Sequence, residues 1–150
     1  MVRFNILILT LFCMYTLLIS GCGGATVEVP ELSPVSGIVT LDEKPIEGVL
    51  IVYVPNNGIP GDGSVAVTDA DGKYTLNHRS GQPGIQAGQY AVTFSKFVLK
   101  DGSAVASDIQ PESVGARQLL PKRYTNPENS KQKATVKKEG GTFDFSLKSK

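Results

Sequence analysis

The sequence of 150 residues contains no Trp and a single His, His78. Histidine is the commonest acid–base residue in enzymes and a frequent metal ligand, so its scarcity argues against His-based catalysis and most metal sites. The sequence has no Gly-x-Ser-x-Gly elbow. The glycine-rich stretch 81–88 lacks the Lys-Ser/Thr of a phosphate-binding loop. These absences favour a protein that is not an enzyme and that uses no metal or other cofactor.

An excess of positive charge is missing as well. The chain has 15 Lys and Arg against 14 Asp and Glu, and Arg3 is the only charged residue among the first 21. Nucleic-acid-binding proteins normally carry a basic excess, so no nucleic-acid partner is expected. Six lysines fall in the last twenty residues, at 131, 133, 137, 138, 148 and 150. We interpret them as a solvated strand face and tail, with a weak patch for an anionic surface as the alternative.

Cysteine is scarce, and both cysteines, Cys13 and Cys22, precede residue 23. Arg3 is followed by an almost wholly apolar run from Phe4 to Ile19. A positive end, an apolar centre and small residues at the boundary are typical of a secretory signal peptide. A membrane-spanning helix is the alternative, but the run is slightly short and lacks a basic flank. We therefore predict a signal peptide over residues 1–21.

The end of this run closely resembles a bacterial lipobox. Leu18, Ile19, Ser20 and Gly21 form the peptidase recognition sequence before Cys22. In such signals the cysteine thiol receives a diacylglyceryl group, and a peptidase then cuts before the cysteine. The resemblance implies that acyl chains on Cys22 bind the protein to a membrane of the cell envelope, because two or more chains give stable anchoring. Gly23, where Asp would signal retention at the inner membrane, favours the outer membrane.

Residues 22–34 are predicted to be the lipidated cysteine and a flexible tether, since Gly-Gly is followed by Pro30 and Pro34. From residue 35 the apolar residues alternate with a period of two, which indicates strands. Turn signals such as Asp69-Ala70-Asp71-Gly72 separate them. About seven strands at this spacing predict an all-β sandwich over residues 35–147, with a tail at 148–150. The predicted inward set is Val39, Leu41, Ile51, Tyr53, Val67, Leu76, Tyr90, Val92, Phe94, Phe143 and Phe145.

Residues 97–123 fit the strand pattern less well. A poor helix is expected around Glu112 to Leu119, broken by Gly115. Long segments without regular structure often carry function, so a functional loop could lie here.

Four stretches together resemble the carboxypeptidase regulatory-like family, also described as transthyretin-like or prealbumin-like domains. They are VSGIVTLDEKPIEGVLIVYVP (35–55), TDADGKYTL (68–76), GIQAGQYAVTFSK (84–96) and LLPKRYTNPENS (119–130). The resemblance implies a seven-stranded Greek-key β-sandwich without catalytic residues of its own. The sequence departs from the enzymatic hydroxyisourate hydrolases of this fold, which need several histidines and a carboxy-terminal Tyr-Arg-Gly-Ser.

The remaining candidate residues favour structural roles. His78 is interpreted as a turn histidine, and Asp69 and Asp71 as turn residues, with calcium binding as the alternative. Tyr53, Tyr74 and Tyr90 lie on apolar faces and are predicted to pack in the core, whereas Tyr124 has no clear place.

We therefore expect a membrane-anchored envelope lipoprotein whose sandwich is a binding or structural module, with an envelope protein or polysaccharide as partner. The alternative is a carrier of a carbohydrate or hydrophobic molecule, which would require a pocket lined by the 97–123 segment.

Overall fold

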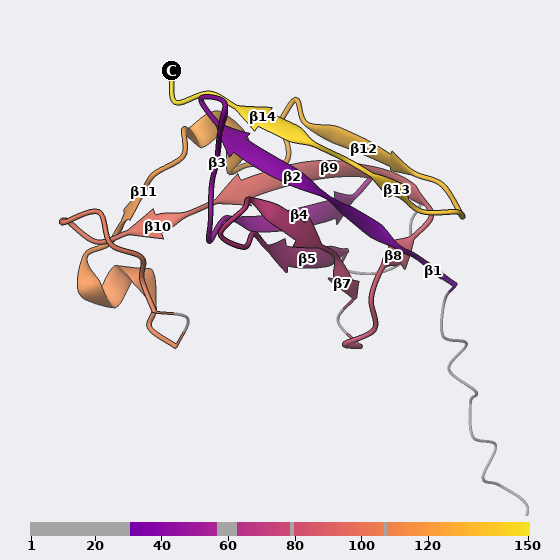
Figure 1. Cartoon of the computed structure of the whole chain (residues 1–150), viewed down its shortest axis with the longest axis horizontal. Coiled ribbons are helices and arrows are strands. Elements are labelled where there is room, and N and C mark those ends of the chain that lie inside the picture. The colour runs from indigo at the N-terminus through magenta and orange to yellow at the C-terminus, as the bar shows by residue number, and fades with distance from the viewer. Residues whose placement is uncertain (1–30, 57–62, 79, 107) are drawn as a thin grey trace, which may run out of the picture.

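The computed structural model describes residues 31–56, 63–78, 80–106 and 108–150. Within these ranges the chain forms two packed β-sheets of five strands each, with two further sheets of two strands (Figure 1). Seven of the described strands are three residues or longer. The predicted all-β sandwich is therefore confirmed.

The first sheet is antiparallel and has the order β12-β9-β4-β5-β7. Its strands are β12 (Lys133–Val136), β9 (Gly88–Ser95), β4 (Leu50–Pro55), β5 (Ser64–Val67) and β7 (Asn77–His78). β4 is central and pairs with β9 along its whole length, from Leu50 opposite Ser95 to Pro55 opposite Tyr90.

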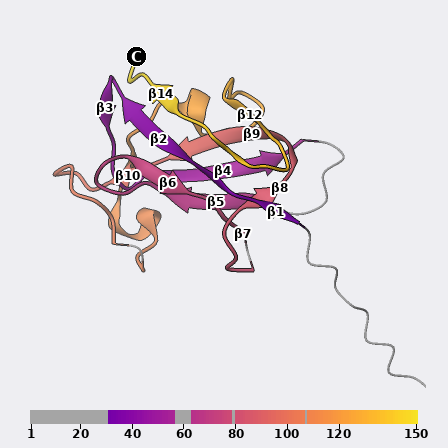
Figure 2. The ribbon, with the colours of Figure 1, turned by 45° about the vertical axis from the view of Figure 1, so that its right-hand side comes forward.

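The second sheet is built around β2 (Val35–Leu41). β6 (Lys73–Thr75) and β3 (Lys44–Pro45) pair antiparallel with β2, whereas β13 (Gly141–Thr142) and β14 (Phe145–Leu147) pair parallel with it. In Figures 1 and 2, β2 runs obliquely across the strands of the first sheet. Strands that follow one another in the chain, such as β5 and β6, often lie in different sheets. Most contacts therefore join residues that are far apart in the sequence.

The core lies between the two sheets. Eight residues of the predicted inward set are buried there: Val39, Ile51, Tyr53, Leu76, Tyr90, Val92, Phe94 and Phe145. Leu41 and Phe143 are only partly buried and pack against the edge of this core. Large buried side chains of this kind each contribute roughly 1.5–3 kcal/mol, which opposes the conformational entropy lost on folding.

The prediction for Val67 was wrong, because its side chain is 59% exposed. In β5 the inward residues are Ser64 and Ala66, and Thr68 follows on the same face. The Thr68 hydroxyl donates to the carbonyl of Ile46 at 2.7 Å and accepts the Val49 N–H at 2.9 Å. These two hydrogen bonds hold the face of Ser64, Ala66 and Thr68 toward the core. Val65 and Val67, which alternate with these residues, therefore point outward.

The poor helix predicted around Glu112–Leu119 is present only in its first part, before the predicted break at Gly115. The structure has a short 3₁₀ helix, η2 (Pro111–Val114), which ends at Gly115 in a left-handed conformation. β11 (Arg117–Gln118) follows and pairs with β10 (Phe97–Val98). Residues 97–119 thus form an arm that extends from the end of β9 (Figure 1).

Both ends of the predicted domain contact neighbouring segments. Leu32–Ser33, at the end of the predicted tether, forms β1 and pairs with β8 (Ile85–Gln86). In the predicted tail, the Lys148 N–H donates to the Tyr124 hydroxyl at 3.1 Å. Among the described residues, no helix has the length and apolar character needed to cross a membrane.

Candidate functional site

A groove at the surface lies where the arm joins the sandwich. It has a volume of about 540 Å³ and is open to solvent. We call it the arm-base groove. Its lining comes from the end of β9, both arm strands, and the segment before β12: Ser95, Phe97, Gln118, Lys122, Thr125, Asn126 and Asn129.

Local hydrogen bonds fix the polar side chains of this groove. The Gln118 Oε1 accepts the backbone N–H of Lys96 at 2.8 Å and that of Leu120 at 3.3 Å. The Asn126 Oδ1 accepts the Glu128 N–H at 2.8 Å. Because an amide carries both an acceptor and two donors, each of these side chains keeps an NH₂ group that can donate in addition to the contacts of its oxygen.

A second groove, of about 220 Å³, lies beside the first and shares Asn129 with it. We call it the loop groove, and its lining residues are Arg123, Tyr124, Asn129, Lys131 and Gln132. Lys122, Arg123 and Tyr124 form the short helix η3 (Lys122–Tyr124). The loop between η3 and β12 therefore supplies side chains to both grooves.

Arg123 is held in place at the loop groove. Its Nη2 donates to the carbonyls of Lys148 and Lys150 at 2.6 and 2.9 Å. Its guanidinium lies 4.9 Å from the centre of the Tyr124 ring, a cation–π distance. Burial raises the pKa of Tyr124, but the Arg123 guanidinium and the Lys148 N–H outweigh it, so the pKa lies below its ordinary value.

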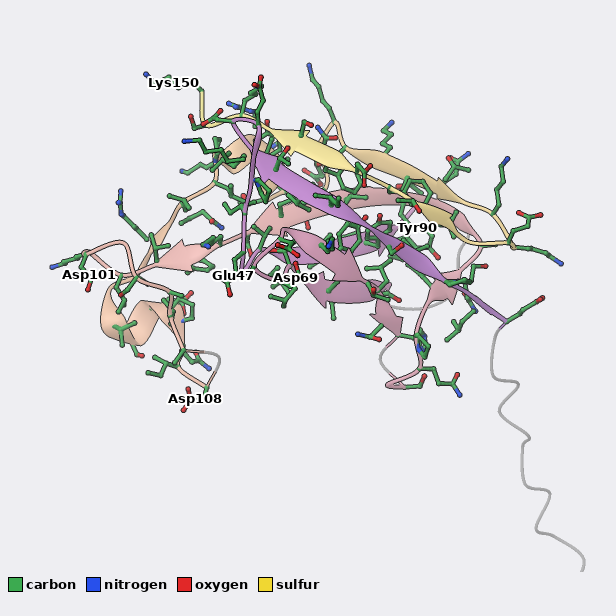
Figure 3. All side chains as sticks on the ribbon, viewed as in Figure 1. Glu47, Asp69, Tyr90, Asp101, Asp108 and Lys150 are labelled. Atoms are coloured by element: carbon green, nitrogen blue, oxygen red, sulfur yellow. The ribbon has the colours of Figure 1, made fainter. Side chains whose placement is uncertain are left out.

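Neither groove is lined by an acidic side chain, whereas Lys122, Arg123 and Lys131 bring three positive charges. Glu128 lies on the same loop but lines a third groove, with Val54, Pro55, Asn56, Ala91 and Pro127. Asp101 and Asp108 lie on the outer part of the arm (Figure 3). The two grooves are thus locally basic on a chain that is close to neutral.

The outer face of the first sheet next to the arm-base groove is apolar. Leu50, Val65 and Val67 are 40%, 45% and 59% exposed. Leu50 pairs with Ser95, a residue of the arm-base groove. Ala91 and Thr93 share this outer face but are buried, and Pro127 and Glu128 line a groove with Ala91.

Two buried tyrosines form a polar chain between the sheets. The Tyr53 and Tyr74 hydroxyl oxygens are 2.9 Å apart, and the Tyr74 hydroxyl donates to the Phe143 carbonyl at 2.7 Å. Burial raises the pKa of Tyr53 to about 12 and raises that of Tyr74 further. A neutral, hydrogen-bonded pair in the core is a structural element, in agreement with the predicted packing of both rings.

The turn aspartates have the structural role predicted for them. The Asp69 Oδ1 accepts the N–H groups of Asp71 and Lys73 at 3.0 and 2.8 Å, and Asp71 pairs with the Lys73 ammonium. His78 lies in β7, where its Nδ1 is 3.0 Å from the Ser80 hydroxyl oxygen. Among the described residues, no three His, Cys, Asp or Glu side chains form a cluster that could hold a metal ion.

The predicted lipidation site, Cys22, and the recognition residues Leu18, Ile19, Ser20 and Gly21 lie outside the described residues. Sequence reasoning missed Lys122, Asn126 and Asn129 as groove residues, although all three lie in the LLPKRYTNPENS stretch. Tyr124, whose place was unclear from the sequence, packs edge-on against Phe94 and lines the loop groove.

Comparisons with known proteins do not assign a family. No family model matches the chain, and no curated protein matches it. Among solved structures, the major pilin subunit of Bacillus cereus aligns with a TM-score of 0.41 and 13% identity. That alignment covers 79% of this chain and 30% of the pilin. A 9R-lipoxygenase from Cyanothece aligns with a TM-score of 0.33 and 16% identity, over 79% of this chain and 16% of the enzyme.

Proposed function

We propose that the chain is a lipid-anchored protein of the cell envelope whose sandwich is a non-catalytic binding module, as the resemblance to carboxypeptidase regulatory-like domains implies. The observation that carries this proposal is the combination of two features. A sequence that resembles a lipobox ends the apolar run at Cys22, and the sandwich behind it carries an open groove lined by amide side chains and Lys122. Acyl chains on Cys22 attach the protein to the membrane, and the grooves face a partner in the envelope.

Substitution of Cys22 tests the anchor. Cys22→Ser removes the only thiol at the predicted cleavage site, so the precursor receives no lipid and is not cut. We expect the variant to keep its full length, and mass spectrometry to find acyl chains on the unchanged protein but not on this variant. Cys13→Ser is the matched control and leaves acylation intact. Mature-length, acylated protein from the Cys22→Ser variant contradicts the proposal.

A small-ligand carrier is the second candidate function, and the arm-base groove favours its carbohydrate form. Phe97 and Gln118 belong to the 97–123 segment in which such a pocket was expected. The groove is open, and six of its seven lining side chains end in a hydroxyl, amide or ammonium group, whereas a carrier of hydrophobic molecules needs an enclosed apolar cavity. A thermal-shift screen with mono- and oligosaccharides tests this candidate, and a rise in the melting temperature that depends on ligand concentration supports it.

A further inference from the structure

We propose that the arm-base groove and the loop groove together bind one acidic polysaccharide, a chain of sugars that bear carboxylates. Lys122 and Lys131 contact the carboxylates, and the amides of Asn126 and Asn129 contact the sugar hydroxyls. This inference rests on the proposed function, because it names the ligand class of the same binding module.

Charge selects an anionic ligand. Lys122 lies in the arm-base groove, and Lys131 lies in the loop groove beside Arg123. Both lysines are exposed, and neither has an ion-pair partner among the described residues. With no acidic residue in either lining, a bound carboxylate meets attraction from three cations and repulsion from no group in the grooves.

The other lining side chains match a sugar. Asn126, Asn129, Gln118 and Gln132 offer amide donors and acceptors, which pair with vicinal hydroxyls. Phe97 is half-buried in the arm-base groove and presents an apolar ring, on which the C–H face of a sugar packs. Phosphate or sulfate alone could accept from these amides but would leave the apolar ring of Phe97 without a contact.

The shape of the two grooves fits an elongated ligand. Their volumes are about 540 and 220 Å³, and Asn129 lines both. A single monosaccharide would fill one groove and leave the cations of the other unused. A polymer that crosses Asn129 contacts both, and the contacts in the second groove then form at high effective concentration.

An acidic polysaccharide fits this surface better than other polyanions. A lipid bilayer presents a flat surface, which does not enter the grooves that these amides line. A single-stranded nucleic acid is bound by several stacking aromatic rings, whereas Phe97 and Tyr124 are the only rings that line these grooves, and Tyr124 is buried.

Binding to polygalacturonate, a polymer of uronic acid, tests the inference. The full chain, purified in mild detergent, is run through native gels that contain polygalacturonate, and its retardation gives the dissociation constant. We expect retardation that weakens as salt rises, because exposed charges are screened. The double variant Lys122→Gln with Lys131→Gln weakens binding about threefold to tenfold, since each exposed ion pair contributes modestly.

A matched double variant, Lys137→Gln with Lys138→Gln, removes the same net charge at exposed lysines outside both grooves. We expect it to bind like the unchanged protein, and equal melting temperatures show that all variants are folded. Equal weakening by the two double variants overturns the inference, because the effect is then one of net charge. Equal retardation by neutral dextran overturns it too. The inference is also overturned if the protein binds only to vesicles of anionic phospholipid, or if it binds to none of the probes. Failure here leaves the Cys22→Ser test of the anchor unaffected.

Discussion

At the scale of single residues, the most informative group is the Tyr74 hydroxyl. It donates to the Phe143 carbonyl, which leaves its lone pairs to accept the proton of the Tyr53 hydroxyl. Gly37 makes this arrangement possible, because a Cβ there would collide with the Phe143 carbonyl. Because Gly37 has no side chain, the Phe143 carbonyl before β14 lies close enough to β6 for the Tyr74 hydroxyl to donate to it.

Removal of the two hydroxyls separately should have unequal effects. Tyr74→Phe leaves both the Phe143 carbonyl and the Tyr53 hydroxyl without a partner, so we expect it to lower the free energy of unfolding by about 1–3 kcal/mol. Tyr53→Phe removes only a donor and should lower it by about 1 kcal/mol or less. Urea unfolding followed by circular dichroism measures both. A larger loss for Tyr53→Phe would contradict the direction of this hydrogen-bond chain.

Gly72 is the second residue whose identity the backbone dictates. Its φ is +74°, and a Cβ would lie 2.6 Å from the Val39 carbonyl oxygen. Gly72→Val should therefore lower the free energy of unfolding by about 1–3 kcal/mol from backbone strain, with the clash added.

Gly81 provides the matched control for this prediction. Its φ is +81°, but no atom of the described residues, apart from its chain neighbours, lies within 4 Å of the position of a Cβ. Gly81→Val carries the strain without the clash and should be less destabilising than Gly72→Val. Equal losses for the two variants, measured by thermal unfolding, would show that the Val39 carbonyl is no obstacle.

At the scale of elements, β5 shows how hydrogen bonds override an apolar alternation. The alternation of residues places Val65 and Val67 on one face of the strand, and this apolar face was predicted to be buried. The opposite face is inward because the Thr68 hydroxyl satisfies Val49 and Ile46, and the Ser64 hydroxyl donates to the Gly84 carbonyl. Small residues also fit there, since Tyr53 of the neighbouring strand and Tyr74 occupy the core nearby.

Two substitutions test the register of this strand. Thr68→Val keeps the shape but leaves the buried Val49 N–H and the part-buried Ile46 carbonyl unpaired, so it should lower the free energy of unfolding by about 1–3 kcal/mol. Val67→Thr, one residue earlier and largely exposed, should change it by less than about 0.5 kcal/mol. Chemical denaturation measures both, and the opposite ranking would restore the inward valine predicted from the sequence.

The arm and the grooves are also decided at the scale of elements. Phe97 and Gln118 are 21 positions apart, and they meet because β10 pairs with β11. Pro111 and Gly115 allow only a short 3₁₀ helix between these strands. Nothing in the periodicity of residues 97–119 shows which of these side chains face Lys122 and Asn129.

At the scale of the whole molecule, the buried tyrosines make stability depend on alkaline pH. The pKa of Tyr53 is raised to about 12, against an ordinary value of 10.0 in the unfolded chain. Above pH 10 the unfolded chain therefore loses a proton that the folded protein keeps, and ionisation favours unfolding. The stabilisation is complete below pH 10 and is lost as pH rises toward 12.

Thermal melting at pH 8, 10 and 11 tests this dependence. We expect the melting temperature to change little up to pH 9 and to fall beyond pH 10, with a shallower fall for Tyr53→Phe, which removes one of the titrating groups. Identical slopes for that variant and the unchanged protein would assign the alkaline fall to other groups.

The sequence by itself determined the all-β class, eight of the core residues and the turn at Asp69, because alternation and turn chemistry are local properties of the chain. The proposed lipid anchor also rests on the local sequence, through the resemblance of residues 18–22 to a lipobox. Only the tertiary structure decided which face of β5 is buried, where the arm extends, and that Phe97, Lys122 and Asn129 line one groove. Those features depend on contacts between strands far apart in the sequence, which a period of two does not encode.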